Sequence, residues 1–265
     1  AQDMARHNMA AFEEYSQIHI VFADGDYHIS DTMKITAKDC FDDGKIIYRS
    51  KRFGNVNLLG STELNKEDFD KVIDKNIFSS LPEEAQVYYQ DLNKYNIFVP
   101  EYSDDCTPGF YADSIEQMIA QYPNDGFTAV KSVLDNNSTD NVTQLELYNE
   151  KNWNNITGAF AEGYFEYDYA YQKIPLLNAG DGVITVDGAN AINTQQYPGK
   201  PRRVRFVNLI EELDSPSEWY LDHKTNTLYW YPENFDKVQS IEITSLSDPM
   251  IELQNAYNIH EKRDS

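Results

Sequence analysis

Short apolar segments separated by Gly, Asp, Asn and Pro residues recur along most of this chain. Residues 18–62 contain IHIVF, TMKIT, KIIYRS and NVNLLG, which are too short and too closely spaced to be joined by helices. Residues 1–12 differ, because Asp3 can cap a helix whose apolar face carries Met4, Ala5, Met9 and Phe12. The pattern predicts a mainly β protein with one or two short helices.

The clearest local prediction is a two-stranded hairpin in residues 218–231. EWYLD and TLYWY each alternate between two faces with the period of two that strands require. The four loop residues HKTN end at Asn226, which tolerates a positive φ better than other non-glycine residues. Pro232 lacks a backbone donor and should end the second strand.

Residues 63–85 have a composition that favours a helix. Phe69, Val72 and Ile73 stand at helical spacing, while Pro82 limits the length of the segment. A short second helix is therefore expected here.

Length and charge restrict the function classes. A chain of 265 residues with 41% hydrophobic residues can form one or two domains with a sizeable core. With 22 Lys and Arg against 44 Asp and Glu, the formal charge of −22 repels nucleic acid and anionic lipid. No run approaches the roughly 18 apolar residues of a membrane span. The N-terminus lacks the layout of a signal peptide, so an exported protein would have lost its signal already.

Several motifs together resemble a known family. They are YPNDGF at 122–127, GYF at 163–165 with DYA at 168–170, the EELD, EWYLD and LYWYP run within 208–232, and DGDYHISDTMKIT near the N-terminus. In this order they resemble large extracellular right-handed parallel β-helix proteins, which are pectin-lyase-like proteins of polysaccharide-degrading bacteria. The 208–232 run is the specific part of this resemblance.

The resemblance implies three regions. Residues 1–62 would form an N-terminal cap and the first β-helix coils, 63–204 an inserted β-rich domain of sandwich or barrel type, and 205–265 the hairpin and the return to the coils. An interrupted stack of coils is a weak fold alone, so further coils or another chain should cover its end. Relatives carry Gly where this chain has Ser217, and a type I turn at Pro216-Ser217 would need no positive φ.

Candidate catalytic residues follow from the chemistry of glycoside cleavage, which uses two carboxylates roughly 5 to 9.5 Å apart. Glu166 and Asp168 are the candidates, with Glu162 nearby, because they lie among aromatic residues that can stack on sugars. Ordinary strand patterning, with one core face and one solvated face, is the simpler explanation. The candidate substrate-binding aromatic residues are Trp153, Tyr164, Tyr167 and Tyr169, although large aromatic residues on strands more often belong to the core.

Arg203 and Arg205 share one strand face and could hold a uronate, although a salt bridge within this acidic protein is the simpler use. Related polysaccharide lyases bind calcium at acidic clusters. Asp39, Asp42 and Asp43 are the best local cluster, yet no calcium motif supports it, so no cofactor is expected. Cys40 and Cys106 permit at most one disulfide, and two free thiols are favoured.

Three functional hypotheses remain open. The leading one is a non-catalytic scaffold or substrate-contacting part of an extracellular or cell-surface β-helix protein that acts on or binds polysaccharide. The second is a complete glycoside hydrolase or polysaccharide lyase. The third is a structural surface protein that associates through its open β-helix end.

Overall fold

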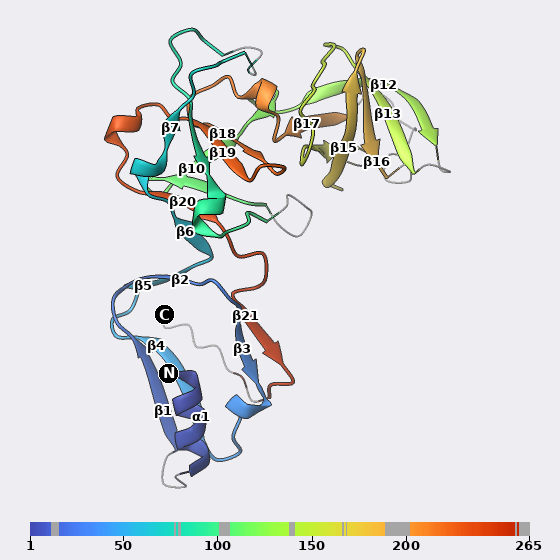
Figure 1. Cartoon of the computed structure of the whole chain (residues 1–265). Helices are drawn as coiled ribbons and strands as arrows, with labels where there is room; N and C mark the ends of the chain where they lie inside the picture. Colours follow the sequence, from blue (N-terminus) through green and yellow to red (C-terminus); the bar gives the residue numbers. More distant parts are fainter. Residues whose placement is uncertain are drawn as a thin grey trace. The chain divides into compact units, whose positions relative to one another are not determined.

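The computed structural model describes the chain except residues 12–15, 77, 79–80, 101–106, 138–140, 166, 168, 189–201, 258 and 260–265. The described chain forms two compact units (Figure 1). The first unit contains residues 1–62 and 245–265, and the second contains residues 63–244. The hairpin and the residues that follow it up to 244 therefore belong to the second unit.

The first unit contains three parallel strand pairs. β1 pairs with β4, β2 with β5 and β3 with β21, each in a continuous register. The chain therefore passes through three strands and then, in the same order, through their three partners. The bounds of these elements are β1 Gln17–Phe22, β2 Gly25–His28, β3 Met33–Thr36, β4 Lys45–Ser50, β5 Val56–Leu59 and β21 Ile251–Gln254.

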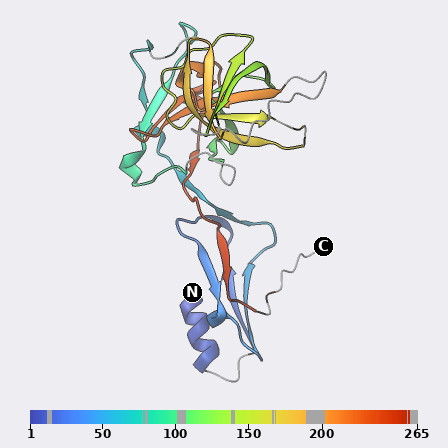
Figure 2. The same ribbon diagram turned by 90° about the vertical axis from the view of Figure 1, so that its right-hand side faces the viewer.

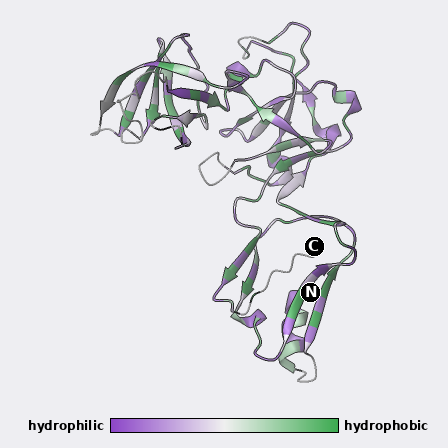
Figure 3. Cartoon of the chain, turned by 180° about the vertical axis from the view of Figure 1, so that it is seen from behind, coloured by the Kyte–Doolittle hydropathy of each residue, from purple (hydrophilic) through white to green (hydrophobic). Residues whose placement is uncertain are grey.

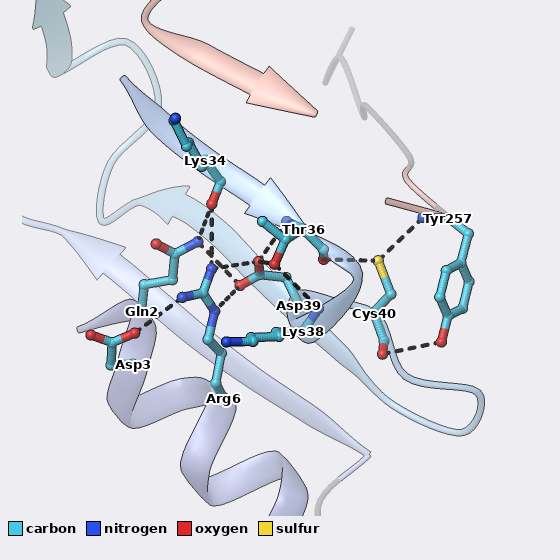
Figure 4. Close-up of polar contacts among 9 residues, drawn as sticks. All are labelled: Gln2, Asp3, Arg6, Lys34, Thr36, Lys38, Asp39, Cys40 and Tyr257. Carbon is cyan, nitrogen blue, oxygen red and sulfur yellow. Dashed lines mark hydrogen bonds and ion pairs between the residues drawn. The ribbon is translucent and has the colours of Figure 1, made fainter. Parts of the chain in front are cut away.

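Helix α1 (Gln2–Ala11) packs against β1 and β4 through Ala5 and Met9, which are buried. Of the other residues predicted on its apolar face, Met4 is 68% exposed and Phe12 lies outside the described residues. A polar cluster also ties the helix to the 3₁₀ turn η1 (Ala37–Asp39), as Figure 4 shows. Arg6 donates from Nη2 to Asp39 Oδ2 at 2.7 Å and from Nε to Oδ1 at 2.7 Å. Asp39 also accepts from the backbone N of Thr36 at 2.8 Å, so this carboxylate joins helix, turn and strand.

The second unit contains an eight-stranded sheet in the order β6-β20-β9-β10-β18-β19-β8-β7. Both faces of its centre are buried. Trp219, Leu221 and Trp230 pack on one face with Phe110, while Tyr220 packs on the other face with residues such as Leu213. The strand bounds are β6 Ser61–Glu63, β7 Asp70–Lys71, β8 Tyr88–Asp91, β9 Phe110–Ala112, β10 Ile115–Ile119, β18 Glu218–Asp222, β19 Thr227–Tyr231 and β20 Ile241–Thr244. The remaining 3₁₀ turns of this part are η2 Lys66–Asp68, η3 Leu92–Tyr95, η4 Ile210–Glu212 and η5 Phe235–Lys237.

The predicted hairpin is confirmed. β18 and β19 pair antiparallel from Glu218↔Tyr231 to Asp222↔Thr227, and Asn226 has φ 54°. The prediction for Ser217 is wrong, because its φ is 72° and the turn therefore does use the left-handed region. The Ser217 N–H donates to Tyr231 O at 2.7 Å, which holds the backbone in this conformation.

The helix predicted within 63–85 is absent from the described residues of that segment, which form β6, η2 and β7 before an irregular stretch. Tertiary packing explains the difference. Phe69 packs in the cluster on one face of the sheet and Val72 in the cluster on the other, while Ile73 is 95% exposed. One helix cannot direct residues 69 and 72 to opposite faces of the same sheet.

The second unit also contains an antiparallel barrel, whose strands curve around a shared interior in Figure 2. The strands β12, β13, β16, β15, β14 and β17 follow one another, and the ring closes because β17 pairs with both β12 and β14. Buried and partly exposed residues alternate along β13 and β16. Figure 3 shows both hydrophobic and hydrophilic residues in the strands of the barrel. The bounds are β11 Gln121–Tyr122, which adds to β17, and β12 Thr128–Asn137, β13 Val142–Leu147, β14 Phe160–Tyr164, β15 Gln172–Gly180, β16 Val183–Asp187 and β17 Arg203–Val207.

Candidate functional site

Strands β14 and β17 place the predicted arginines on the outer face of the barrel. Val204 and Phe206 point into the barrel core, so Arg203 and Arg205 alternate to the outside. The register sets Glu162 opposite Arg205 and Tyr164 opposite Arg203. Gly163 permits this close pairing, because it has φ 147° and a Cβ there would stand 2.2 Å from Arg203 O.

Glu162 is fully buried although it lies on the outer face of the barrel. Arg205 Nε donates to Glu162 Oε1, and Arg205 Nη2 donates to the Tyr171 hydroxyl at 3.4 Å. Burial and the charge of Glu162 together raise the pKa of Tyr171 to about 12. Burial alone would lower the pKa of Arg205, but the charges and hydrogen bonds of Glu162 and Tyr171 together outweigh it, and the pKa is raised. Arg205 therefore forms a salt bridge with Glu162, which is the simpler use that the acidic composition suggested for it.

Three aromatic rings surround this ion pair. Phe127, Tyr164 and Tyr171 contact one another edge to face, with centroids 5.3 to 6.5 Å apart. The Arg203 guanidinium lies 4.6 Å from the Tyr164 ring centroid, which is within the range of a cation–π interaction. We call these residues, with Glu162 and Arg205, the arginine–aromatic cluster.

The loop between β14 and β15 adds two more tyrosines beside this cluster in sequence. Tyr167 and Tyr169 stack with their rings 6° from parallel and centroids 5.2 Å apart. Tyr169 is 83% exposed, so one face of this pair is available to a ligand. The predicted catalytic residues Glu166 and Asp168 lie outside the described residues.

Trp153 occupies a different place from the other candidate aromatic residues. Its side chain is 3% exposed within the barrel core, and Nε1 donates to Glu212 Oε1 at 2.6 Å. Lys151 Nζ donates to the same oxygen at 2.8 Å. The ring is therefore unavailable for stacking on a sugar, and the core alternative explains this residue.

The EELD and EWYLD segments contribute buried carboxylates that hold loops together. Glu211 Oε1 accepts the backbone N–H groups of Asn154 and Asn155 at 2.7 and 3.1 Å. Glu218 Oε2 accepts those of Asp214 and Ser215, both at 2.9 Å. The turn is thus capped by Glu218.

A groove of about 290 Å³ lies against Arg205, between the barrel and the large sheet of the same unit. Glu116, Met118 and Ile119 line it from β10, and Gln121 lines it from β11. Of the residues that line this groove, the sequence identified Arg205 as a candidate for ligand binding. It did not identify Glu116 or Gln121. Their only sequence signal is the polar spacing in IEQMIAQ, which many edge strands share.

The structure gives no support for a metal centre in the residues that it describes. No group of three or more His, Cys, Asp or Glu residues there is placed to hold an ion. Asp39 of the candidate calcium cluster is already bound by Arg6. Cys40 is a free thiol, and Cys106 lies outside the described residues. Within the described part, no helix has the length and apolarity to cross a membrane.

Comparisons with known proteins identify a structural likeness at low identity. No family model and no curated protein matches the sequence. A solved structure described as a glycoside hydrolase matches with a TM-score of 0.64 over 94% of this chain, at 15% identity. The chain spans 42% of the length of that protein. The likeness shows a shared mainly β fold.

Proposed function

We propose that this chain is a carbohydrate-contacting, non-catalytic part of a longer extracellular or cell-surface protein that acts on or binds polysaccharide. The stacked pair of Tyr167 and Tyr169, whose Tyr169 ring is exposed and which lies near the arginine–aromatic cluster in sequence, carries this proposal. Flat aromatic faces bury the apolar face of a sugar ring, and neighbouring guanidinium groups donate to its hydroxyls. The glycoside hydrolase to which the chain is structurally similar supports a carbohydrate ligand.

We also propose that the first unit is the start of a right-handed parallel β-helix. Its support is the order of the three parallel pairs, in which β1, β2 and β3 meet β4, β5 and β21 in sequence. Each pair is a separate two-stranded sheet in the described chain, so its strands keep edges on which further coils can pair. Coils of a longer protein are the proposed occupants of these edges.

A non-catalytic role fits the one candidate carboxylate that is described. Glu162 is 0% exposed and bound to Arg205, so it cannot reach a glycosidic oxygen. A general acid must lie within hydrogen-bonding distance of the atom that it protonates.

The test is affinity electrophoresis of the chain through gels containing soluble plant, algal and bacterial polysaccharides. At least one polysaccharide should retard the wild-type chain. Tyr169→Ala should weaken that interaction about tenfold, because one stacking face is lost. Tyr148→Ala is the matched control, since Tyr148 is also an exposed barrel tyrosine (67%) but follows β13.

Three results would contradict the proposal. Retardation by no polysaccharide would reject carbohydrate binding, and equal losses in the two tyrosine variants would reject the site. Release of reducing ends by the chain alone would show that it is a complete hydrolase or lyase.

A further inference from the structure

The groove beside Arg205 has the size of a single sugar ring. Its volume is about 290 Å³, close to the lower end of the roughly 300 to 1,000 Å³ of small-molecule sites. Met118, Ile119 and Trp219 provide apolar lining, which suits the C–H face of a sugar ring.

The groove also contains a hydrogen-bond acceptor that the protein leaves unused. Gln121 is 4% exposed, and its amide nitrogen donates to Asn124 O at 3.2 Å and contacts Met118 Sδ. Its side-chain oxygen accepts no hydrogen bond within the described chain, yet it is not among the atoms sealed from solvent. A buried amide that is fixed by its nitrogen therefore offers its oxygen to a hydroxyl donor.

Two charged residues that line the groove, Arg205 and Glu116, would act differently on a charged ligand. Arg205 is already paired with the buried carboxylate of Glu162, so most of its positive charge is compensated. Glu116 is exposed and forms no ion pair with any described residue. A ligand carboxylate would gain little from Arg205 and would be repelled by Glu116.

We propose that this groove binds one neutral sugar ring and discriminates against a uronate at the same position. The inference rests on the proposed carbohydrate function and specifies its substrate class. Gln121 and Glu116 accept from ring hydroxyls, and the unoccupied donors of Arg205 bind a hydroxyl oxygen. Glu116 sets the charge preference.

The experiment uses oligosaccharide pairs that differ only at carbon 6. Cellohexaose is compared with its C6-oxidised glucuronan hexamer, and mannohexaose with hexamannuronate, by isothermal titration calorimetry with the full chain. The wild type should bind the neutral member of at least one pair more tightly, by about fivefold or more. Glu116→Gln keeps an acceptor but removes the charge. It should raise the affinity for the uronate member about fivefold relative to the affinity for the neutral member of the same pair.

Glu67→Gln is the matched control, because it removes the same charge from an exposed position outside the groove. An equal gain of uronate affinity in both variants would mean that the overall charge of −22 sets the preference, which overturns the inference. Equal or tighter binding of uronates by the wild type, or no binding of either neutral probe, also overturns it. A chain that needs Tyr169 for binding but shows no charge preference keeps the proposed function and loses only this inference.

Discussion

Glu218 should make the second unit less stable as the pH rises from 4.5 to 7. The side chain is 1% exposed, and its Oε1 has no hydrogen-bond partner within the described chain. Burial raises its pKa to about 7, against the lowering effect of the Ser215 and Asp214 N–H groups, and the charges of Asp214 and Glu212 add to the increase. The folded state thus prefers the protonated carboxyl group.

The sign and size follow from linkage between protonation and folding. Below pH 4.5, Glu218 is protonated in both states and its contribution is fully present. Between pH 4.5 and 7 the unfolded chain ionises while the folded chain stays protonated, so stability is lost until the pH passes the folded pKa. A difference of about 2.5 pKa units, at about 1.36 kcal/mol each, corresponds to about 3 kcal/mol.

Urea unfolding followed by tryptophan fluorescence measures this effect in the right unit, because Trp153, Trp219 and Trp230 all lie in it. Glu218→Gln mimics the protonated form and should remove the pH-dependent loss. The free energy of unfolding of this variant minus that of the wild type should rise by about 3 kcal/mol from pH 4.5 to 8. Glu233→Gln, at an exposed position in the same unit, should show a flat difference. A flat or falling difference for Glu218→Gln would refute the reasoning.

Two further substitutions test the backbone and the first unit. Ser217→Gly should stabilise the second unit by about 1 kcal/mol in the same unfolding assay, because glycine removes the cost of φ 72°. Ser217→Ala keeps that cost, so an equal gain in both variants would show that the hydroxyl group, rather than the backbone, is responsible. Arg6→Ala should leave Asp39 buried without its cation and increase hydrogen exchange in α1 by at least about tenfold. Arg49→Ala, in β4 of the same unit, is the control, and unchanged α1 protection in Arg6→Ala would contradict the anchoring role.

Sequence patterns within single strands predicted those parts of the fold that depend on residues close together in the sequence. The hairpin of β18 and β19 was predicted with its bounds, because alternation, loop length and Asn226 all act within 14 residues. The segment 63–85 was mispredicted because the destinations of Phe69 and Val72 depend on a sheet assembled from distant strands. Ser217 was mispredicted because its φ is fixed by the pairing of Met118 and Tyr231 with its backbone, which the local sequence does not reveal.

The candidate site was only partly predictable for a related reason. Strand alternation places Glu162 and Arg205 on the outer face of the barrel. Simple strand patterning would make such a face either part of a buried core or exposed to solvent. It is neither, because Tyr171 and Arg205 cover Glu162 while remaining partly accessible themselves. Pairing of the buried Glu162 carboxylate with the partly exposed Arg205 fixes the side-chain positions before any ligand arrives, which lowers the entropic cost of binding. The same pairing compensates the charge of Arg205, which is why we propose that this position donates to neutral hydroxyl groups although the sequence suggests a uronate.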